Sequence, residues 1–300
     1  MISWQTITQK AKSSPAITIA VARAEDEVVI SALKQAHDLG LVNGILVGKK
    51  KALETELKKQ NIPLNLFEIV NCETDEEAAK ISVRLVKENR AQTLMKGMIG
   101  TSTLLKAVVD RETGLRVETS GRTSLLSHVL AAGIDDRFYF ITDAGMNIAP
   151  DLNQKVSIIE NAVLVAQHLG ISEPKVAQIC AVETVNPSMP CTVDAAEISK
   201  MCENGQIKGC LIGGPFGLDN AVSIEAARHK KITHPVAGHA DILMVPDIEA
   251  GNILAKTLIY FSKAKVGGII AGASAPIILL SRADDDATKL NSILLAKAIS

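Results

Sequence analysis

The chain has 300 residues, which at about 150 residues per domain predicts two domains. Its 32 Lys and Arg nearly balance its 33 Asp and Glu, so a formal charge of -1 provides no electrostatic footprint for nucleic acid or an anionic membrane. The 47% hydrophobic content excludes a disordered chain, and the 3% of aromatic residues leave few rings to stack on bases or sugars.

The cysteines predict neither a secreted disulfide framework nor a zinc clip, because they are odd in number and no two are spaced C-x-x-C. We interpret them as reduced core thiols. They are Cys72, Cys180, Cys191, Cys202 and Cys210. The N-terminal sequence has no apolar region of the kind found in secretory signals, and no apolar stretch reaches the length of a bilayer span. We therefore expect a cytoplasmic protein.

Short apolar runs alternate with longer amphipathic stretches along the chain, and this pattern predicts an α/β fold of mainly parallel sheets with helices on both faces. The predicted strands before residue 100 are 16–21, 44–47, 66–70 and 93–96. The predicted helices between and after them are 25–39, 50–59, one starting at the Thr74/Glu77 capping box, and a short one after the GMIGTST turn.

The periodicity then changes to that of a β-hairpin, with extended runs at 125–132 and 137–141 joined by Gly133 to Asp136. After Pro150 the alternation resumes. The predicted helices are 153–169, 193–203, 219–229, 250–262 and 284–299, and the predicted strands are 176–182, 209–212, 242–245, 268–271 and 277–280. We place the domain boundary near residues 146–153.

Several common catalytic patterns are absent from the sequence. It has no G-x-x-x-x-G-K-[ST], no G-x-G-x-x-G and no G-x-S-x-G. His229, His234 and His239 recur every five residues, a spacing that puts them on one face of neither a helix nor a strand. We predict no metal site.

Four loops at predicted strand ends remain as candidates, since open α/β sheets bind ligands at such ends. The residues Gly97 to Thr103 follow a strand and open a helix, where free amides and hydroxyls could hold a phosphate. An ordinary capped helix start fits them equally well. The glycines of Gly213 to Asn220 permit close approach of a ligand, although a plain turn needs them too.

The third and fourth loops are less easily explained by local structure. In Pro246 to Asn252, a glycine and an asparagine in a first helical turn reduce helix propensity without a packing gain, which favours function. In Ala275 to Asp284, an apolar strand delivers Ser281 and Arg282 at its end. Arginine can clamp a phosphate bidentately and serine can donate to a developing anion, whereas the structural alternative is a serine cap with an arginine paired to nearby aspartates.

These loops together resemble one family. The strings DAGMNIAPDL, GGPFGLDNA, PVAGHADILMVPDIEAGNILAK and APIILLSRADDDATK resemble, in order and spacing, the phosphotransacylases, which comprise phosphate acetyl- and butyryltransferases. The similarity is greatest to the phosphate butyryltransferase branch and extends through most of residues 97–288.

The resemblance implies a two-domain fold of the isocitrate/isopropylmalate dehydrogenase type. It implies a first domain at 1–148 that also packs the C-terminal helix 284–300, a second at 149–283, and an active site in the cleft between them. The implied reaction is reversible acyl transfer between CoA and inorganic phosphate, with acyl-CoA and phosphate as substrates and no metal or redox cofactor. A homodimer or larger homo-oligomer is also implied.

Three positions depart from the acetyl-specific relatives. Thr288 stands where those relatives have a carboxylate, so Asp284, Asp285 or Asp286 is expected to replace it. A family arginine in the helix after residue 100 has no counterpart, and Lys106 is the nearest cation. Ile278 and Leu279 replace an amide and a carboxylate, which predicts a preference for butyryl or a branched acyl group over acetyl.

The predicted site has two sets of residues. The catalytic set is Ser281, Arg282, Asp284 and Asp286. The substrate-binding set is Thr101, Ser102, Thr103, Lys106, Gly214, Phe216, Asp219, Gly251, Asn252, Ile278 and Leu279. The alternatives are a phosphate acetyltransferase, a metal- or NAD-dependent dehydrogenase of the same fold, and a non-catalytic two-lobed ligand-binding protein.

Overall fold

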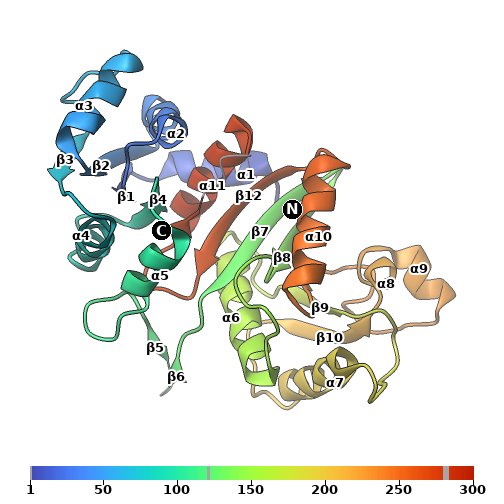
Figure 1. Cartoon of the computed structure of the whole chain (residues 1–300). Coiled ribbons are helices and arrows are strands. Elements are labelled where there is room, and N and C mark those ends of the chain that lie inside the picture. Colours follow the sequence, from blue (N-terminus) through green and yellow to red (C-terminus); the bar gives the residue numbers. More distant parts are fainter. Residues whose placement is uncertain (1, 120–121, 280–283) are drawn as a thin grey trace. The chain divides into compact units, whose positions relative to one another are not determined.

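The computed structural model describes residues 2–119, 122–279 and 284–300 (Figure 1). The chain forms two compact units. Unit 1 consists of residues 1–3 and 125–266, and unit 2 consists of residues 4–124 and 267–300. The chain thus passes between the units at 124–125 and 266–267, and the hairpin that the sequence analysis placed before the boundary belongs to unit 1.

Unit 2 contains a sheet whose order is β12-β13-β4-β1-β2-β3. Five of these strands run parallel, and β12, which enters the unit at Gly267, is antiparallel to β13. The strands are β1 (Ile17–Ala22), β2 (Val42–Gly48), β3 (Glu68–Asn71), β4 (Thr93–Lys96), β12 (Lys265–Ala271) and β13 (Ile277–Ile278). The small antiparallel pair β5 (Glu118–Thr119) and β6 (Arg122–Thr123) also belongs to this unit.

Five helices of unit 2 pack in two groups, α1 and α2 against α11, and α4 against α5, while α3 packs on β2 and β3. They are α1 (Trp4–Ser13), α2 (Glu27–Asp38), α3 (Lys50–Lys59), α4 (Asp75–Lys87), α5 (Thr101–Val108) and α11 (Asp286–Ile299). The predicted capping box of α4 is confirmed, because the Thr74 side chain accepts from the Glu77 amide and the Glu77 side chain accepts from the Thr74 amide. The sequence analysis missed α1, a polar helix that buries only Ile7 and Ala11.

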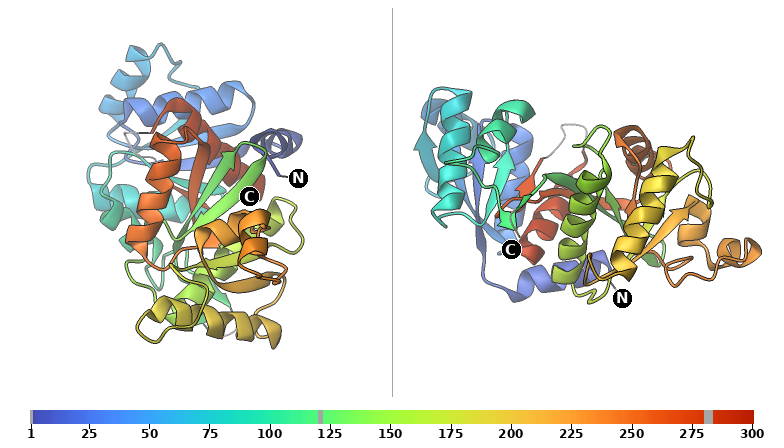
Figure 2. Two further views of the ribbon diagram at one scale, coloured as in Figure 1. Left: turned by 90° about the vertical axis from the view of Figure 1, so that its right-hand side faces the viewer. Right: turned by 90° about the horizontal axis from the view of Figure 1, so that it is seen from below.

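Unit 1 has a sheet in the order β10-β9-β11-β8-β7, and the predicted hairpin is confirmed as its antiparallel part. Its strands are β7 (Ser127–Ile134), β8 (Arg137–Thr142), β9 (Lys175–Ile179), β10 (Leu211–Phe216) and β11 (Ile242–Met244). Its helices are α6 (Leu152–His168), α7 (Pro190–Glu203), α8 (Leu218–Val222), α9 (Ile224–His229) and α10 (Ile248–Tyr260), and Figure 2 shows them from two further sides.

Helices cover the sheet of unit 1 through apolar contacts. The helices α6 and α7 pack on each other and on the strands, while Ala221, Ala227 and Ala255 bring α8, α9 and α10 into one buried cluster with the strands. In unit 2, Ile19 to Ala22 of β1 are fully buried. Buried, near-continuous apolar strands are typical of parallel sheets covered on both faces, so the predicted α/β class is confirmed.

Two local predictions in unit 1 are wrong. The loop expected from Gly213 is strand through Phe216, with an irregular register between Gly213 and Phe216. The single helix expected at 219–229 is two helices, because Ser223 is extended and its side chain caps α9 by accepting from the Ala226 amide. None of the helices in the described ranges has the length and apolarity needed to cross a membrane.

His234 gives unit 1 a predicted pH dependence. Its half-buried ring lies 5.8 Å from the Phe216 ring, and its Nδ1 accepts a hydrogen bond from the Val236 amide at 3.2 Å. Burial lowers the pKa of His234. The unfolded chain therefore binds this proton more readily than the folded chain does, and the free energy of unfolding is expected to fall as the pH falls through about 6.5.

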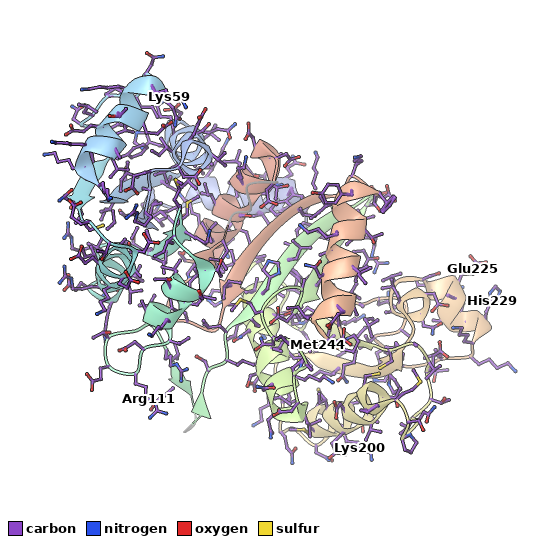
Figure 3. The ribbon with its side chains drawn as sticks, viewed as in Figure 1. Lys59, Arg111, Lys200, Glu225, His229 and Met244 are labelled. Atoms are coloured by element: carbon purple, nitrogen blue, oxygen red, sulfur yellow. The ribbon has the colours of Figure 1, made fainter. Side chains whose placement is uncertain are left out.

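A denaturation series between pH 7 and pH 5 checks this expectation. The variant His234→Asn keeps an acceptor but does not titrate, so it should lose less stability over that interval than the wild-type protein. The control is His229→Asn, at the exposed end of α9 (Figure 3), which should follow the wild type. Equal slopes for all three proteins would contradict the assignment.

Candidate active site

Parallel pairing in unit 2 brings two of the predicted site segments to one edge of its sheet. Ile277 and Ile278 of β13 lie beside Leu94 and Met95 of β4, and the strands run in the same direction. The loop 97–100 and helix α5 follow β4, and the segment that contains Ser281 and Arg282 follows β13. Ser281 and Arg282 themselves lie outside the described residues.

The loop after β4 is held close to the end of β1. The Gly97 amide donates to the Ala22 carbonyl at 2.9 Å, and the Met98 amide donates to the Arg23 carbonyl at 2.7 Å. A Cβ on Gly97 would lie 2.0 Å from that Arg23 oxygen, so this position requires glycine. The loop then opens α5 at Gly100, whose cap has no side-chain hydrogen bond. The first-turn amides of α5 are therefore available to an anion.

Four predicted binding residues lie on α5. Thr101, Ser102 and Lys106 are exposed, and Thr103 is half-buried. Lys106 is four residues after Ser102 and three after Thr103, so it lies on the same face of the helix as these two residues. Helix α5 thus carries the hydroxyls of Ser102 and Thr103 and the ammonium group of Lys106 on one face.

Lys96 is a second cation at this edge that the sequence analysis missed. It is the last residue of β4, it is half-buried, and its Nζ donates to the Gly97 carbonyl at 3.2 Å. In the sequence, Lys96 is the charged residue of the run Thr93 to Lys96, and it directly precedes the glycine turn.

The two aliphatic residues before Ser281 have different surroundings. Ile278 is fully buried, so its side chain belongs to the core. Leu279 is half-buried. Of the two residues predicted to select the acyl group, Leu279 is therefore the one with surface available for a substrate.

The three aspartates at the start of α11 also differ in their contacts and exposure. Asp285 is the N-cap and accepts from the Thr288 amide at 2.7 Å, a hydrogen bond that lowers the pKa of Asp285. Asp286 pairs with Lys289 at 3.0 Å and is otherwise exposed. These local roles are the structural alternative for both residues. Asp284, which is half-buried, precedes the cap.

In unit 1, the glycine-rich segment Gly213 to Asn220 offers less exposed surface for a ligand than expected. Gly214 lies within β10, and Phe216 is only 5% exposed and belongs to the apolar core. Asp219 is exposed and pairs with Lys230 at 3.1 Å, and Glu183 pairs with the same lysine at 2.6 Å. The hydrogen bond from Lys230 lowers the pKa of both carboxyl groups.

Gly251 has a packing role. A Cβ on Gly251 would lie 2.7 Å from the carbonyl oxygen of Asp143 and 3.0 Å from the Cα of Ala144. The carboxylate of Asp143 accepts four hydrogen bonds, from the amides of Gly145, Met146 and Asn147 and from the side chain of Asn147. The loop against which α10 packs is therefore internally fixed, and only glycine fits there. Asn252, the next residue, is exposed.

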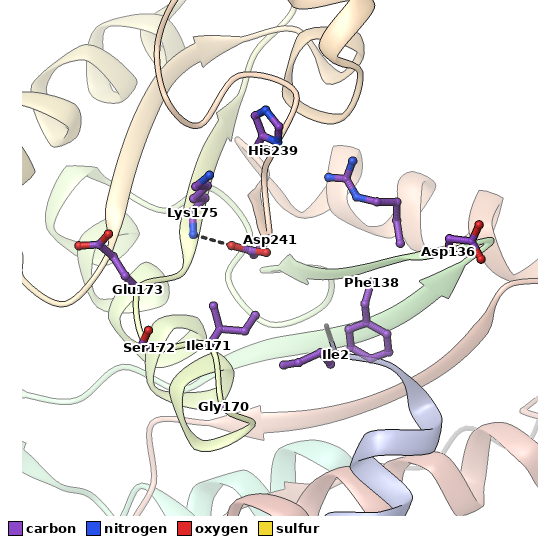
Figure 4. Close-up of a pocket in the computed structure, with 11 residues that line it drawn as sticks. Ile2, Asp136, Phe138, Gly170, Ile171, Ser172, Glu173, Lys175, His239 and Asp241 are labelled. Carbon is purple, nitrogen blue, oxygen red and sulfur yellow. Dashed lines mark hydrogen bonds between the residues drawn. The ribbon is translucent and has the colours of Figure 1, made fainter.

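A cavity of about 580 Å³ lies in unit 1 at the edge of the sheet where β8 and β9 begin (Figure 4). The predicted site residues of unit 1 lie toward the other edge, where the strands end. Asp241 accepts from the Lys175 amide at 2.8 Å beside it, and burial raises the pKa of Asp241. None of the predicted site residues lines this cavity. Within the described ranges, no three His, Cys, Asp or Glu side chains are arranged to hold a metal ion.

The contrast between Gly251 and Asn252 is testable. Gly251→Ala should lower the free energy of unfolding by about 1–3 kcal/mol, the usual cost of overpacking. Asn252→Ala, one residue further along α10, should leave the urea denaturation midpoint unchanged. A stable Gly251→Ala protein would show that close packing does not explain this glycine.

Comparison with known proteins shows the family of the chain. The model of the family described as "Phosphate acetyl/butaryl transferase" matches residues 3–83 and 77–297. The chain is 47% identical to a phosphate butyryltransferase of Clostridium beijerinckii, over 98% of this chain and 96% of that protein. It is 44% identical to a phosphate acetyltransferase of Thermotoga maritima, over 93% of each.

Solved structures agree with this match. A branched-chain phosphotransacylase from Enterococcus faecalis V583 is similar with a TM-score of 0.82 and 34% identity, covering 94% of this chain and 99% of that one. A putative 4-hydroxythreonine-4-phosphate dehydrogenase from Salmonella typhimurium, covering 95% of this chain and 100% of that one, shares the fold alone, with a TM-score of 0.59 and 13% identity. The dehydrogenase-like fold predicted from the resemblance is thereby confirmed, and the chain is a transferase that belongs to the phosphate acetyl/butyryl transferase family.

Proposed function

We propose that this enzyme transfers a butyryl group, or a branched acyl group of similar size, reversibly between CoA and inorganic phosphate. The observation that carries the proposal is the 47% identity with a protein named phosphate butyryltransferase over nearly the whole length of both chains. Leu279 supports it, because this half-buried aliphatic residue stands where the acetyl-specific pattern has a carboxylate. The acetyltransferase alternative rests on the relative of that name at 44% identity.

The phosphate would be held by cations and amides at the edge of unit 2. We assign its contacts to the first-turn amides and hydroxyls of α5, to Lys106 and to Arg282. The uncapped first turn of α5 supports this assignment, since such amides attract anions. Lys96 adds a second ammonium group at the start of the same loop.

The transfer itself would be direct. A phosphate oxygen attacks the thioester carbonyl, the carbonyl oxygen becomes an oxyanion, and the carbon–sulfur bond then breaks to release CoA as a thiolate. Ser281 would donate a hydrogen bond to the oxyanion or the thiolate, and Arg282 would clamp the phosphoryl oxygens in a bidentate geometry. Holding both substrates together removes most of the entropic cost of their meeting. The residues in this scheme need no metal or redox cofactor.

The reverse reaction needs a base for the CoA thiol, whose pKa near 8.5 leaves only a few per cent thiolate at pH 7. We assign this role to Asp284. Asp284 is half-buried, whereas the alternatives Asp285 and Asp286 are exposed.

Two rival functions have less support. A dehydrogenase of this fold rests on likeness to a structure with 13% identity, which extends to the fold alone. A non-catalytic binding protein of two lobes has no support among the relatives described above. The expected homo-oligomer and the cytoplasmic location stay predictions.

An acyl-CoA series tests the proposed function. Thiol release from acetyl-, butyryl- and isobutyryl-CoA should require phosphate, and kcat/KM should be higher for a four-carbon substrate than for acetyl-CoA. Two extra methylenes at about 0.8 kcal/mol each amount to somewhat over tenfold. Phosphate-dependent release with a preference for acetyl-CoA would support the acetyltransferase alternative. No release from any acyl-CoA, or a nicotinamide-dependent absorbance change instead, would refute acyl transfer.

The base is tested separately with neighbouring carboxylates. Asp284→Asn should lower the rate of acyl-phosphate consumption at least about 100-fold and remove the acidic limb of its pH profile, as expected for loss of a general base. Asp286→Asn is the matched control and should retain most of the activity, because the Asp286 side chain is 82% exposed and serves a local contact with Lys289. Similar mild effects in both variants would place the base elsewhere.

A further inference from the structure

The cavity of unit 1 at the edge where β8 and β9 begin takes no part in the proposed acyl transfer, but it has the size and the lining of a ligand site. Its volume of about 580 Å³ falls within the roughly 300–1,000 Å³ that is usual for small-molecule sites. Every residue that lines it belongs to unit 1. The lining has titratable groups of both charge signs, which are Asp136, Arg137, Glu173, Lys175, His239 and Asp241.

The register of the sheet brings charged groups from three strand starts together. The strand β11 lies between β8 and β9 and runs parallel to both. By this register Asp241, directly before β11, is level with Tyr139 of β8 and with Lys175 of β9, so the three side chains share one face of the sheet. Neighbouring strands are only about 4.8 Å apart, and a small molecule can therefore reach all three strand starts at once.

Asp241 has one carboxylate oxygen left for a ligand. Its amide donates to the Lys175 carbonyl at 2.8 Å and its carbonyl accepts from the Phe140 amide at 2.8 Å, so its backbone is fixed between the two neighbouring strands. Its Oδ2 accepts from the Lys175 amide at 2.8 Å (Figure 4). Among the described residues, Oδ1 has no hydrogen-bond donor. Burial raises the pKa of this carboxyl group, and a cationic donor at Oδ1 would compensate the charge that burial disfavours.

Arg137 and Lys175 are cations without a carboxylate partner in the part of the chain that the structure describes. The Arg137 guanidinium lies over the Tyr139 ring, 5.3 Å from its centre, and one of its nitrogens donates to the Gly238 carbonyl at 3.4 Å. These contacts orient the guanidinium and leave most of its five N–H donors unused. Lys175 is the first residue of β9 and is half-buried.

The cavity also has an apolar side. Figure 4 shows the side chains of Ile2, Phe138 and Ile171 on one side of Asp241, and His239 on the other. The three apolar side chains are half-buried, so each has surface that a ligand can cover. An aliphatic group placed there would be removed from water, which favours binding.

The charges indicate the class of ligand. A simple anion would pair with Arg137 and Lys175 but would also meet the carboxylates of Asp136, Glu173 and Asp241. A simple cation would pair with these carboxylates but would meet the guanidinium and the ammonium group. A small molecule that carries both a carboxylate and an ammonium group satisfies both sets, and an aliphatic chain on it matches the apolar side.

We propose that this cavity binds a free α-amino acid with an aliphatic side chain. Its carboxylate accepts hydrogen bonds from the Arg137 guanidinium and the Lys175 ammonium group, and its own ammonium group donates to Oδ1 of Asp241. Its side chain packs against Phe138 and Ile171. Binding is independent of the proposed acyl transfer, since it uses none of the residues assigned to that reaction.

A calorimetric titration of the folded full-length protein, in buffer without phosphate or acyl-CoA, tests the proposal with L-leucine and L-valine as probes. At least one of them should bind saturably and raise the Tm. Three analogues of leucine each lack one part, because 4-methylpentanoate has no ammonium group, 3-methylbutylamine no carboxylate and glycine no side chain. Each should bind at least about tenfold more weakly, as expected for loss of a charge-assisted hydrogen bond or of a buried aliphatic chain.

Several outcomes of the titration would overturn the proposal. The first is no saturable binding of either probe up to about 10 mM, well above a Kd of 1 mM. Binding of 4-methylpentanoate as tight as that of leucine would show a simple anion site, and equally tight binding of 3-methylbutylamine would show a simple cation site. Glycine that binds as tightly as leucine would show that the apolar side takes no part.

Variants test the two charged contacts. Asp241→Asn keeps an oxygen for the Lys175 amide but removes the charge, and Arg137→Gln removes the guanidinium. Each should weaken binding of the amino acid at least about tenfold. The matched controls Glu225→Gln and Lys200→Gln change exposed residues of unit 1 away from the cavity (Figure 3) and should bind like the wild type.

Circular dichroism shows whether each variant is folded. Unchanged affinity in folded Asp241→Asn or in folded Arg137→Gln would overturn the proposal. Should neither variant fold, the analogue series on the wild-type protein decides.

Discussion

The parallel pairing of β13 with β4 is the contact on which the arrangement of unit 2 depends. It is only two residues long, yet it sets the direction of the segment that leaves β13 and therefore the edge at which that segment emerges. The same edge receives the loop after β4, which hydrogen bonds tie to the end of β1. The segments that follow two strands about 180 positions apart in sequence thus leave the sheet at the same edge.

The charged side chains near the predicted site differ in whether the protein already pairs them. Lys230 satisfies two carboxylates in unit 1, and Asp143 is satisfied by four donors, so both groups hold local structure. Lys106, in contrast, is exposed on α5. Groups that are already paired inside the protein have little interaction left for a substrate.

Much of the fold could be predicted because periodicity and capping are local. The α4 capping box and the β7–β8 hairpin are examples in which a few neighbouring residues determine the structure. The segment at Gly213 was wrongly predicted as a loop, because the need for glycine there comes from a tertiary contact. A Cβ there would lie 2.5 Å from the ring of His234, a residue that sequence alone does not bring to that position. Gly251 likewise has a packing reason that the sequence does not show, and Ile278 could not be separated from Leu279 without knowing which side chain the core covers.

The order of the strands in unit 2 also has a consequence for how the protein is made. The sheet places β13, from the last thirty residues of the chain, between β12 and β4. The ribosome therefore completes β1 to β4 long before β13 exists. The side of β4 that later pairs with β13 stays unpaired while the whole of unit 1 is synthesised. Unit 1, apart from residues 1–3, is continuous in sequence and can fold during this interval, whereas unit 2 closes only when its last helix is released.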